Sequence, residues 1–188
     1  LSKPPADDLT AIPHPIIGYM GQIGDRVDFE LLREVALARP DWSLVLVGPV
    51  WENKRAVAEA LGALPNVYFL GWRPYTELPS FMRGFDVCAI PHTCDRLTAS
   101  MDPIKLYDYL TSGKPIVTTR VAGIDRFLDV LYIADGPAEF VACTAAALAE
   151  ADPERVAKRK EYARANTWQR RAAELYQIVR AQVESRGR

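Results

Sequence analysis

Two kinds of apolar pattern alternate along the chain. Short apolar runs rich in β-branched and aromatic residues are typical of buried strands, and apolar residues recurring every three to four positions are typical of helices. The predicted strands cover residues 16–20, 42–47, 67–70, 87–90, 115–118 and 131–134. The predicted helices cover residues 28–39, 54–61, 76–83, 103–112, 137–150 and 152–165, and a last helix begins after Thr167.

This alternation predicts an α/β fold, a doubly wound, Rossmann-like parallel sheet of about six strands within residues 16–150. Residues 1–15 hold four of the fourteen prolines and are interpreted as a linker, and residues 151–188 as C-terminal helices. Ligands of such sheets bind beyond the carboxyl ends of the strands. The residues that follow each strand are therefore the candidates for a site.

Charge and composition narrow the class of ligand. The 23 basic and 24 acidic residues of the 188 nearly cancel, so no basic field is available for nucleic acid. No apolar run approaches the ~18 residues of a membrane span. The three cysteines lack metal-ligand spacing and indicate a reducing compartment, so we expect a cytoplasmic protein without a bound metal.

The loop after the first strand contains Gly18, Gly21 and Gly24. This spacing is not the dinucleotide-binding GxGxxG, and no acidic residue ends the second strand to hold a ribose. Two interpretations remain for the loop. It is a tight strand-to-helix turn, or its backbone at Gly21 and Gln22 approaches a ligand.

Trp72 and Arg73 follow the third strand. An exposed aromatic ring and an arginine in a loop can flank a base or a phosphate. A core tryptophan beside a solvated arginine is the alternative.

The segment from His92 to Lys105 is rich in hydroxyl groups and leads directly into a helix. The first-turn N–H groups of a helix lack partners and favour an anion, and Lys105 in that turn would share it. Asp108 lies three residues further on and either pairs with Lys105 or accepts hydrogen bonds from sugar hydroxyls. His92 is either a general base or a structural residue.

Three stretches in register carry a family resemblance. They are PIKLYDYLTSGKPIV at 103–117, NVYFLG at 66–71 and DWSLVLVGP at 41–49. Together they resemble the donor site of GT-B retaining glycosyltransferases of the large family 4, and the match extends over residues 15–148. The resemblance implies the C-terminal, donor-binding one of two Rossmann-like halves.

The resemblance also implies roles for single residues. Backbone N–H groups at the start of the helix that opens with Pro103 and Ile104 would lie at the donor diphosphate, the main chain at Trp72 and Arg73 would lie at the base, and Asp108 would bind the ribose hydroxyls. The two glutamates that the family spaces eight apart are replaced here by Ser100 and Asp108. Gln22 and Arg26 are the nearest substitutes for the usual donor-site Arg and Lys. Lys105 would then take the diphosphate charge, and Lys105 and His92 are the candidate catalytic residues.

The resulting expectation is the donor-binding half of a metal-independent glycosyltransferase of polysaccharide biosynthesis, with a nucleotide sugar as substrate and no cofactor. The missing N-terminal half would bind the acceptor, receive the C-terminal helices and provide any peripheral membrane contact, so this chain alone would be inactive. Two alternatives remain. One is a non-catalytic scaffold module, favoured by Ser100, and the other is a sugar-nucleotide epimerase, which needs more acid–base residues than His92.

Overall fold

The computed structural model describes residues 4–96 and 98–186. Six strands form one sheet in the order β3-β2-β1-β4-β5-β6, and every neighbouring pair is parallel. The strands are β1 (Ile16–Met20), β2 (Ser43–Val47), β3 (Val67–Gly71), β4 (Val87–Ile90), β5 (Ile116–Thr119) and β6 (Leu131–Ala134). The prediction of a doubly wound parallel sheet is confirmed.

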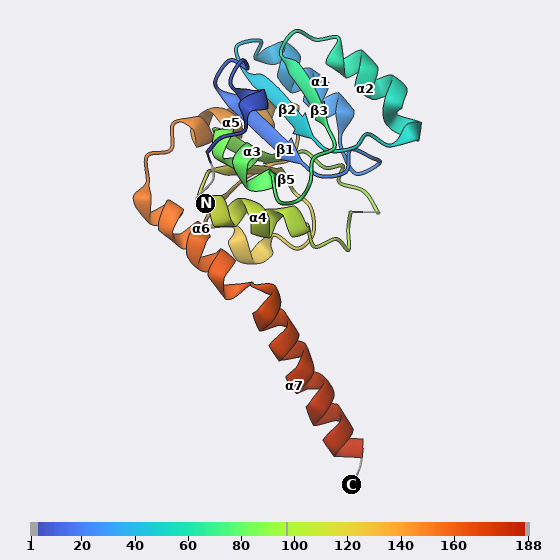
Figure 1. Ribbon diagram of the computed structural model, residues 1–188, viewed down its shortest axis with the longest axis vertical. Coiled ribbons are helices and arrows are strands. Elements are labelled where there is room, and N and C mark those ends of the chain that lie inside the picture. The colour runs from blue at the N-terminus through green and yellow to red at the C-terminus, as the bar shows by residue number, and fades with distance from the viewer. Residues whose placement is uncertain (1–3, 97, 187–188) are drawn as a thin grey trace.

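Helices cover both faces of this sheet (Figure 1). One core lies between the sheet and α1, α2 and α5, and the second lies between the sheet and α3, α4 and α6. The helices are α1 (Phe29–Ala38), α2 (Arg55–Gly62), α3 (Leu78–Gly84), α4 (Ile104–Ser112), α5 (Pro137–Leu148), α6 (Pro153–Ala165) and α7 (Trp168–Arg186). Three short 3₁₀ turns, at Asp7–Leu9, Glu52–Lys54 and Asp125–Phe127, were not predicted.

Polar caps and glycine fix the helix ends where the sequence predicts them. The Asp28 carboxylate accepts a hydrogen bond from the Leu31 N–H at 2.9 Å and begins α1, and Asp152 caps α6 in the same way. Gly113 ends α4 in the left-handed conformation at φ 74°. The C-terminal end of α4 is therefore set by local sequence.

The chain reverses its direction of winding between β1 and β4. These two strands are adjacent in the sheet, yet β1 leads into α1 on one face and β4 leads into α4 on the other. Such a switch point leaves a crevice beyond the carboxyl ends of the strands. At this edge a Cβ on Gly48 would lie 1.9 Å from the Gly21 carbonyl oxygen, so the ends of β1 and β2 meet closely only because Gly48 has no side chain.

The segments at the two ends of the chain contact the body of the domain. Leu9 and Ile12 are buried, and Asp8 pairs with Arg73 at 2.6 Å. At the other end α6 packs along α4, and α7 projects away from the body (Figure 1). The division into linker, domain and C-terminal helices stays a prediction.

A buried ion pair attaches α6 to the domain. The Arg159 guanidinium is fully buried and forms two hydrogen bonds, of 2.5 and 2.6 Å, with the Glu150 carboxylate. It also donates to the carbonyl oxygens of Val130 and Gly113. Arg159 thus joins α6 to the segments before β5 and β6.

Candidate functional site

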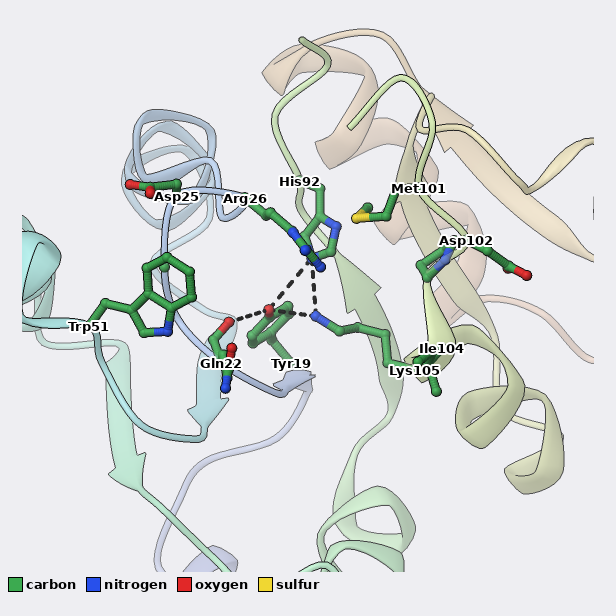
Figure 2. Close-up of a pocket in the computed structure, with 12 residues that line it drawn as sticks. Tyr19, Gln22, Asp25, Arg26, Trp51, His92, Met101, Asp102, Ile104 and Lys105 are labelled. Atoms are coloured by element: carbon green, nitrogen blue, oxygen red, sulfur yellow. Dashed lines mark hydrogen bonds between the residues drawn. The ribbon is translucent and has the colours of Figure 1, made fainter. Parts of the chain in front are cut away.

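A cavity of about 200 Å³ lies at the switch point, beyond the carboxyl ends of β1 and β4 (Figure 2). Its walls come from both faces of the sheet, because the loops after β1 and β2 form one side and the start of α4 forms the other. The lining side chains on which the following argument depends are Tyr19, Gln22, Arg26, Trp51, His92 and Lys105.

Lys105 points from the first turn of α4 toward the centre of this cleft (Figure 2). Its Nζ lies 2.5 Å from the Tyr19 phenol oxygen, 3.0 Å from His92 Nε2 and 3.8 Å from the centre of the Tyr19 ring. The Tyr19 hydroxyl donates in turn to the Gln22 carbonyl oxygen at 2.9 Å. The cluster therefore joins β1, the loop after it, the end of β4 and α4.

His92 lies two residues after the end of β4, and contacts of its backbone hold it in place. Its carbonyl oxygen accepts a hydrogen bond from the Thr119 hydroxyl at 2.6 Å, and its backbone forms an isolated antiparallel β-bridge with Val27. The side chain is 2% exposed, and its Nδ1 is buried without a hydrogen-bond partner among the described residues. Burial, with the charges of Lys105 and Arg26, lowers the pKa of His92 to about 3.

The cleft gathers positive charge without a paired acid. Among the described residues no carboxylate pairs with Lys105 or Arg26, because Asp25 pairs with Lys54 at 3.0 Å and Asp102 lies 3.4 Å from Arg171. Burial lowers the pKa of Lys105 well below its ordinary value, and the nearby Arg26 charge lowers it further. An uncompensated cationic cleft is suited to an anionic ligand.

The N-terminus of α4 forms the adjoining wall. No side chain caps the helix at Pro103, and the neighbouring Asp102 carboxylate is turned to the Tyr107 hydroxyl at 3.0 Å. Unpaired N–H groups and the positive end of the helix dipole favour an anion at this place. Pro103, Ile104 and Lys105 all line the cleft, as the sequence predicts.

The glycine loop after β1 lies against Lys105. Gly21 has a φ of +133°, and a Cβ there would lie 3.2 Å from Lys105 Nζ. Gln22 lines the cleft and Arg26 reaches it from the same loop. The structure thus brings Gly21, Gln22 and Arg26 together with Lys105 and His92.

Four other predicted site residues lie outside the residues that line this cavity. The Trp72 side chain is 66% exposed after β3, and the Arg73 guanidinium pairs with Asp8. The Asp108 carboxylate accepts a hydrogen bond from the Tyr75 hydroxyl at 3.0 Å; burial raises its pKa, and the Tyr75 hydrogen bond opposes that shift. Ser100 is exposed in the loop before α4.

Two of the six side chains named first for the cleft, Tyr19 and Trp51, were not predicted as site residues from the sequence. Tyr19 was assigned only to a strand, although its place next to the last residue of β1 is a signal that it could reach the ligand edge. Trp51 is 41% exposed beside Gly24, where a Cβ would lie 2.5 Å from the indole ring. Its position just after the Gly-Pro that ends β2 was the available signal.

Neither a metal cluster nor a membrane helix is found in the described part of the chain. No group of three or more His, Cys, Asp or Glu side chains among residues 4–96 and 98–186 could hold a metal ion. None of the helices described there is long and apolar enough to span a bilayer.

Comparison with known proteins shows which family the chain belongs to. Residues 14–156 match the family described as Glycosyl transferases group 1. The chain belongs to this family. The family 4 resemblance and the C-terminal domain of the GT-B fold, both predicted from the sequence, are thereby confirmed.

Individual glycosyltransferases show the same likeness. TuaH of Bacillus subtilis (strain 168), named as a glycosyltransferase of teichuronic acid biosynthesis, is 29% identical over 159 residues, or 81% of this chain and 40% of TuaH. The C-terminal domain of LpcC from Francisella tularensis matches 85% of this chain and 89% of that domain, with a TM-score of 0.60 and 16% identity. Anabaena HepE, in complex with UDP and glucose, matches 94% of this chain and 50% of its own, with a TM-score of 0.64 and 18% identity. The chain thus spans half or less of the length of TuaH and HepE.

Proposed function

We propose that this glycosyltransferase domain binds the donor nucleotide sugar and that Lys105, Arg26 and the start of α4 hold its diphosphate. The observation that carries the proposal is the Lys105 side chain, which points into the switch-point cleft with no carboxylate beside it among the described residues. The structure of Anabaena HepE in complex with UDP and glucose supports this class of ligand.

In the proposed reaction a metal ion is not needed. Negative charge develops on the diphosphate as the bond to the sugar breaks, and preorganised cations and backbone N–H groups stabilise it. Lys105 and Arg26 supply the positive charge, and the uncapped N-terminus of α4 supplies the N–H groups. His92 touches Lys105 rather than the open cleft alone, so we assign it to positioning the lysine.

The whole enzyme would include an N-terminal half that binds the acceptor. Apolar side chains along α7 are exposed and support the proposal that α6 and α7 pack against that half; they include Trp168, Leu175, Tyr176, Ile178, Val179 and Val183. The three cysteines are free thiols, which supports a cytoplasmic location.

A second candidate is a binding module that has lost transfer chemistry. Ser100 favours it, because this exposed hydroxyl stands where the family resemblance expects a carboxylate at the sugar. Thermal-shift measurements with UDP-, GDP-, ADP- and dTDP-sugars separate the two candidates. Stabilisation by one of these donors supports the donor domain, and no stabilisation by any of them favours the scaffold.

The Lys105→Ala variant tests the proposed diphosphate site. Loss of a charge-assisted hydrogen bond should weaken binding of the nucleoside diphosphate by about 1–3 kcal/mol in isothermal titration calorimetry. Lys158→Ala, on α6, is the matched control because its ammonium group pairs with Asp129 away from the cleft. Unchanged affinity in Lys105→Ala would remove Lys105 from the site.

A further inference from the structure

The hydrogen bonds around Lys105 restrict where the protons of the cluster can be. A tyrosine has a single O–H, and that of Tyr19 is donated to the Gln22 carbonyl oxygen at 2.9 Å. The Tyr19 oxygen therefore accepts at its 2.5 Å contact with Lys105, and Nζ donates one N–H there. This much holds for a charged or a neutral lysine.

The 3.0 Å contact between Lys105 Nζ and His92 Nε2 distinguishes the two states. A charged lysine has no lone pair, so it must donate to Nε2, and the neutral imidazole then carries its proton on Nδ1. A neutral lysine can instead accept from an Nε2–H, which leaves Nδ1 as a bare acceptor. Nδ1 is buried without a partner among the described residues.

An unpaired buried acceptor is more easily tolerated than an unpaired buried N–H. The geometry of His92 therefore favours the Nε2–H form donating to a neutral Lys105 in the empty cleft. The alternative would bury an N–H at Nδ1 with no acceptor among the described residues.

The titratable and charged groups that face Lys105 also favour its neutral form. Tyr19 from β1, Arg26 from the loop after it and His92 after β4 surround Nζ, and none of them is an anion. The nearest lining carboxylates pair elsewhere, since Asp25 is held by Lys54 and Asp102 lies between Tyr107 and Arg171. Burial and the Arg26 charge also lower the pKa of Lys105.

We propose that binding of the donor diphosphate is coupled to the uptake of one proton, with the hydrogen bond between Lys105 and His92 reversing its direction. The Nε2 proton of His92 passes to Nζ, which becomes an ammonium group, and one proton from the solvent binds to Nδ1. The imidazole stays neutral in its other tautomer, and the pair gains one positive charge opposite the diphosphate.

This coupling rests on the proposed function and makes Tyr19 and His92 positioning residues of Lys105. Tyr19 fixes Nζ by accepting its hydrogen bond, and His92 supplies the proton that the bound anion requires. A charged ammonium in contact with phosphate forms shorter and stronger hydrogen bonds than a neutral amine does. Lys105 is then uncharged without the donor and carries a paired charge when the donor is bound.

The chain offers a direct spectroscopic test because it has two histidines, His14 and His92. Long-range ¹H–¹⁵N NMR of the 188-residue chain reports the tautomer of each imidazole. We expect His92 as the Nε2–H form in the free chain and as the Nδ1–H form when saturated with UDP or with inorganic pyrophosphate. His14 pairs with Asp86 on the surface and serves as the internal reference.

Calorimetry in two buffers of different ionisation enthalpy counts the protons. We expect uptake of about one proton per UDP bound near neutral pH, and no uptake in Lys105→Met, in which His92 should keep one tautomer throughout. A Tyr19→Phe variant keeps the ring and loses the acceptor, so its pH profile of binding should shift while the fold persists.

The outcomes separate this inference from the proposed function. An Nδ1–H tautomer in the free chain, or UDP binding without proton uptake, overturns the coupling and leaves the donor site standing. Failure of UDP, the other nucleoside diphosphates and pyrophosphate to bind overturns the proposed function and the coupling with it.

Discussion

His92 is a buried imidazole that the folded domain keeps uncharged. Its pKa falls to about 3, mainly through burial, with smaller contributions from the charges of Lys105 and Arg26. In the unfolded chain the same group titrates near 6.5. Between these values the unfolded state binds more protons than the folded state, so acid favours unfolding.

Acid sensitivity of the domain is the first prediction at the residue scale. The free energy of unfolding should decrease as pH falls from about 6.5 toward 3, with His92 contributing up to about 1.4 kcal/mol per pH unit. Urea unfolding at a series of pH values measures this slope. The slope should become shallower in His92→Gln and persist in the control His14→Gln; an equal slope in both variants would exclude His92 as its source.

Single residues of the cleft were predictable where local sequence determines their place. Lys105, Pro103 and Ile104 were recognised because a helix N-terminus is encoded by neighbouring residues, and the glycine loop was recognised by its spacing. Tyr19 was missed because the direction in which a strand residue points depends on which strands flank it. The pairing of Arg73 with Asp8 joins residues 65 positions apart, and nothing in either local sequence indicates it.

At the scale of elements, Arg159 determines how α6 is held. Its guanidinium is fully buried and binds Glu150, which also pairs with Arg155 at 3.0 Å. A buried charge whose partner is removed is strongly destabilising, because the remaining ion cannot be solvated.

The Arg159→Met variant should lower the free energy of unfolding by about 3 kcal/mol, the lower part of the usual range, since Arg155 still compensates Glu150. Denaturant unfolding followed by circular dichroism provides the measurement. Arg33→Met is the surface control, because its pair with Glu30 is exposed and should change stability by less than about 1 kcal/mol. A small loss in Arg159→Met would show that α6 is held by its apolar contacts alone.

Elements and their ends were largely predictable. Asp28, Asp152 and Gly113 fix helix ends through contacts within a few residues, and the strands differ from the prediction by at most one residue at either end. The 3₁₀ turns could not be predicted, since three residues are too few to show a period. The roles of α6 and α7 as partners of another half remain predictions.

At the scale of the whole molecule, the proposed transfer reaction needs more than the cleft of this chain. Transfer requires an acceptor held in line with the donor and a site closed to water, and both need surfaces beyond the switch-point cleft. The alignments with TuaH and HepE cover 40% and 50% of those proteins.

We therefore expect no sugar transfer by the 188-residue chain alone. Incubation with the donor that stabilises it best, followed by chromatography of released nucleoside diphosphate, should show no release above that of the uncatalysed donor. Measurable turnover would contradict the need for a second half. The control is binding of the same donor by calorimetry, which establishes that the site is occupied during the assay.

The order of the strands follows from physical rules more than from any one residue. Right-handed crossovers and helices on both faces leave few topologies for six parallel strands, so the sheet was predictable as a class. The direction of α7 was not predictable. Its apolar residues are exposed and α7 projects away from the body, so the sequence pattern does not indicate where the helix points.

Because Lys105 has no acid beside it among the described residues, the stability of the folded domain should depend on whether the donor is bound. A cleft that buries Lys105 without an acid beside it gives up stability that an apolar lining would supply, and a bound anion returns it. By mass action, donor at about 100 times its dissociation constant adds about 2.7 kcal/mol to the folded state. In a cell, the lifetime of this polypeptide against proteolysis would then rise and fall with the supply of activated sugar.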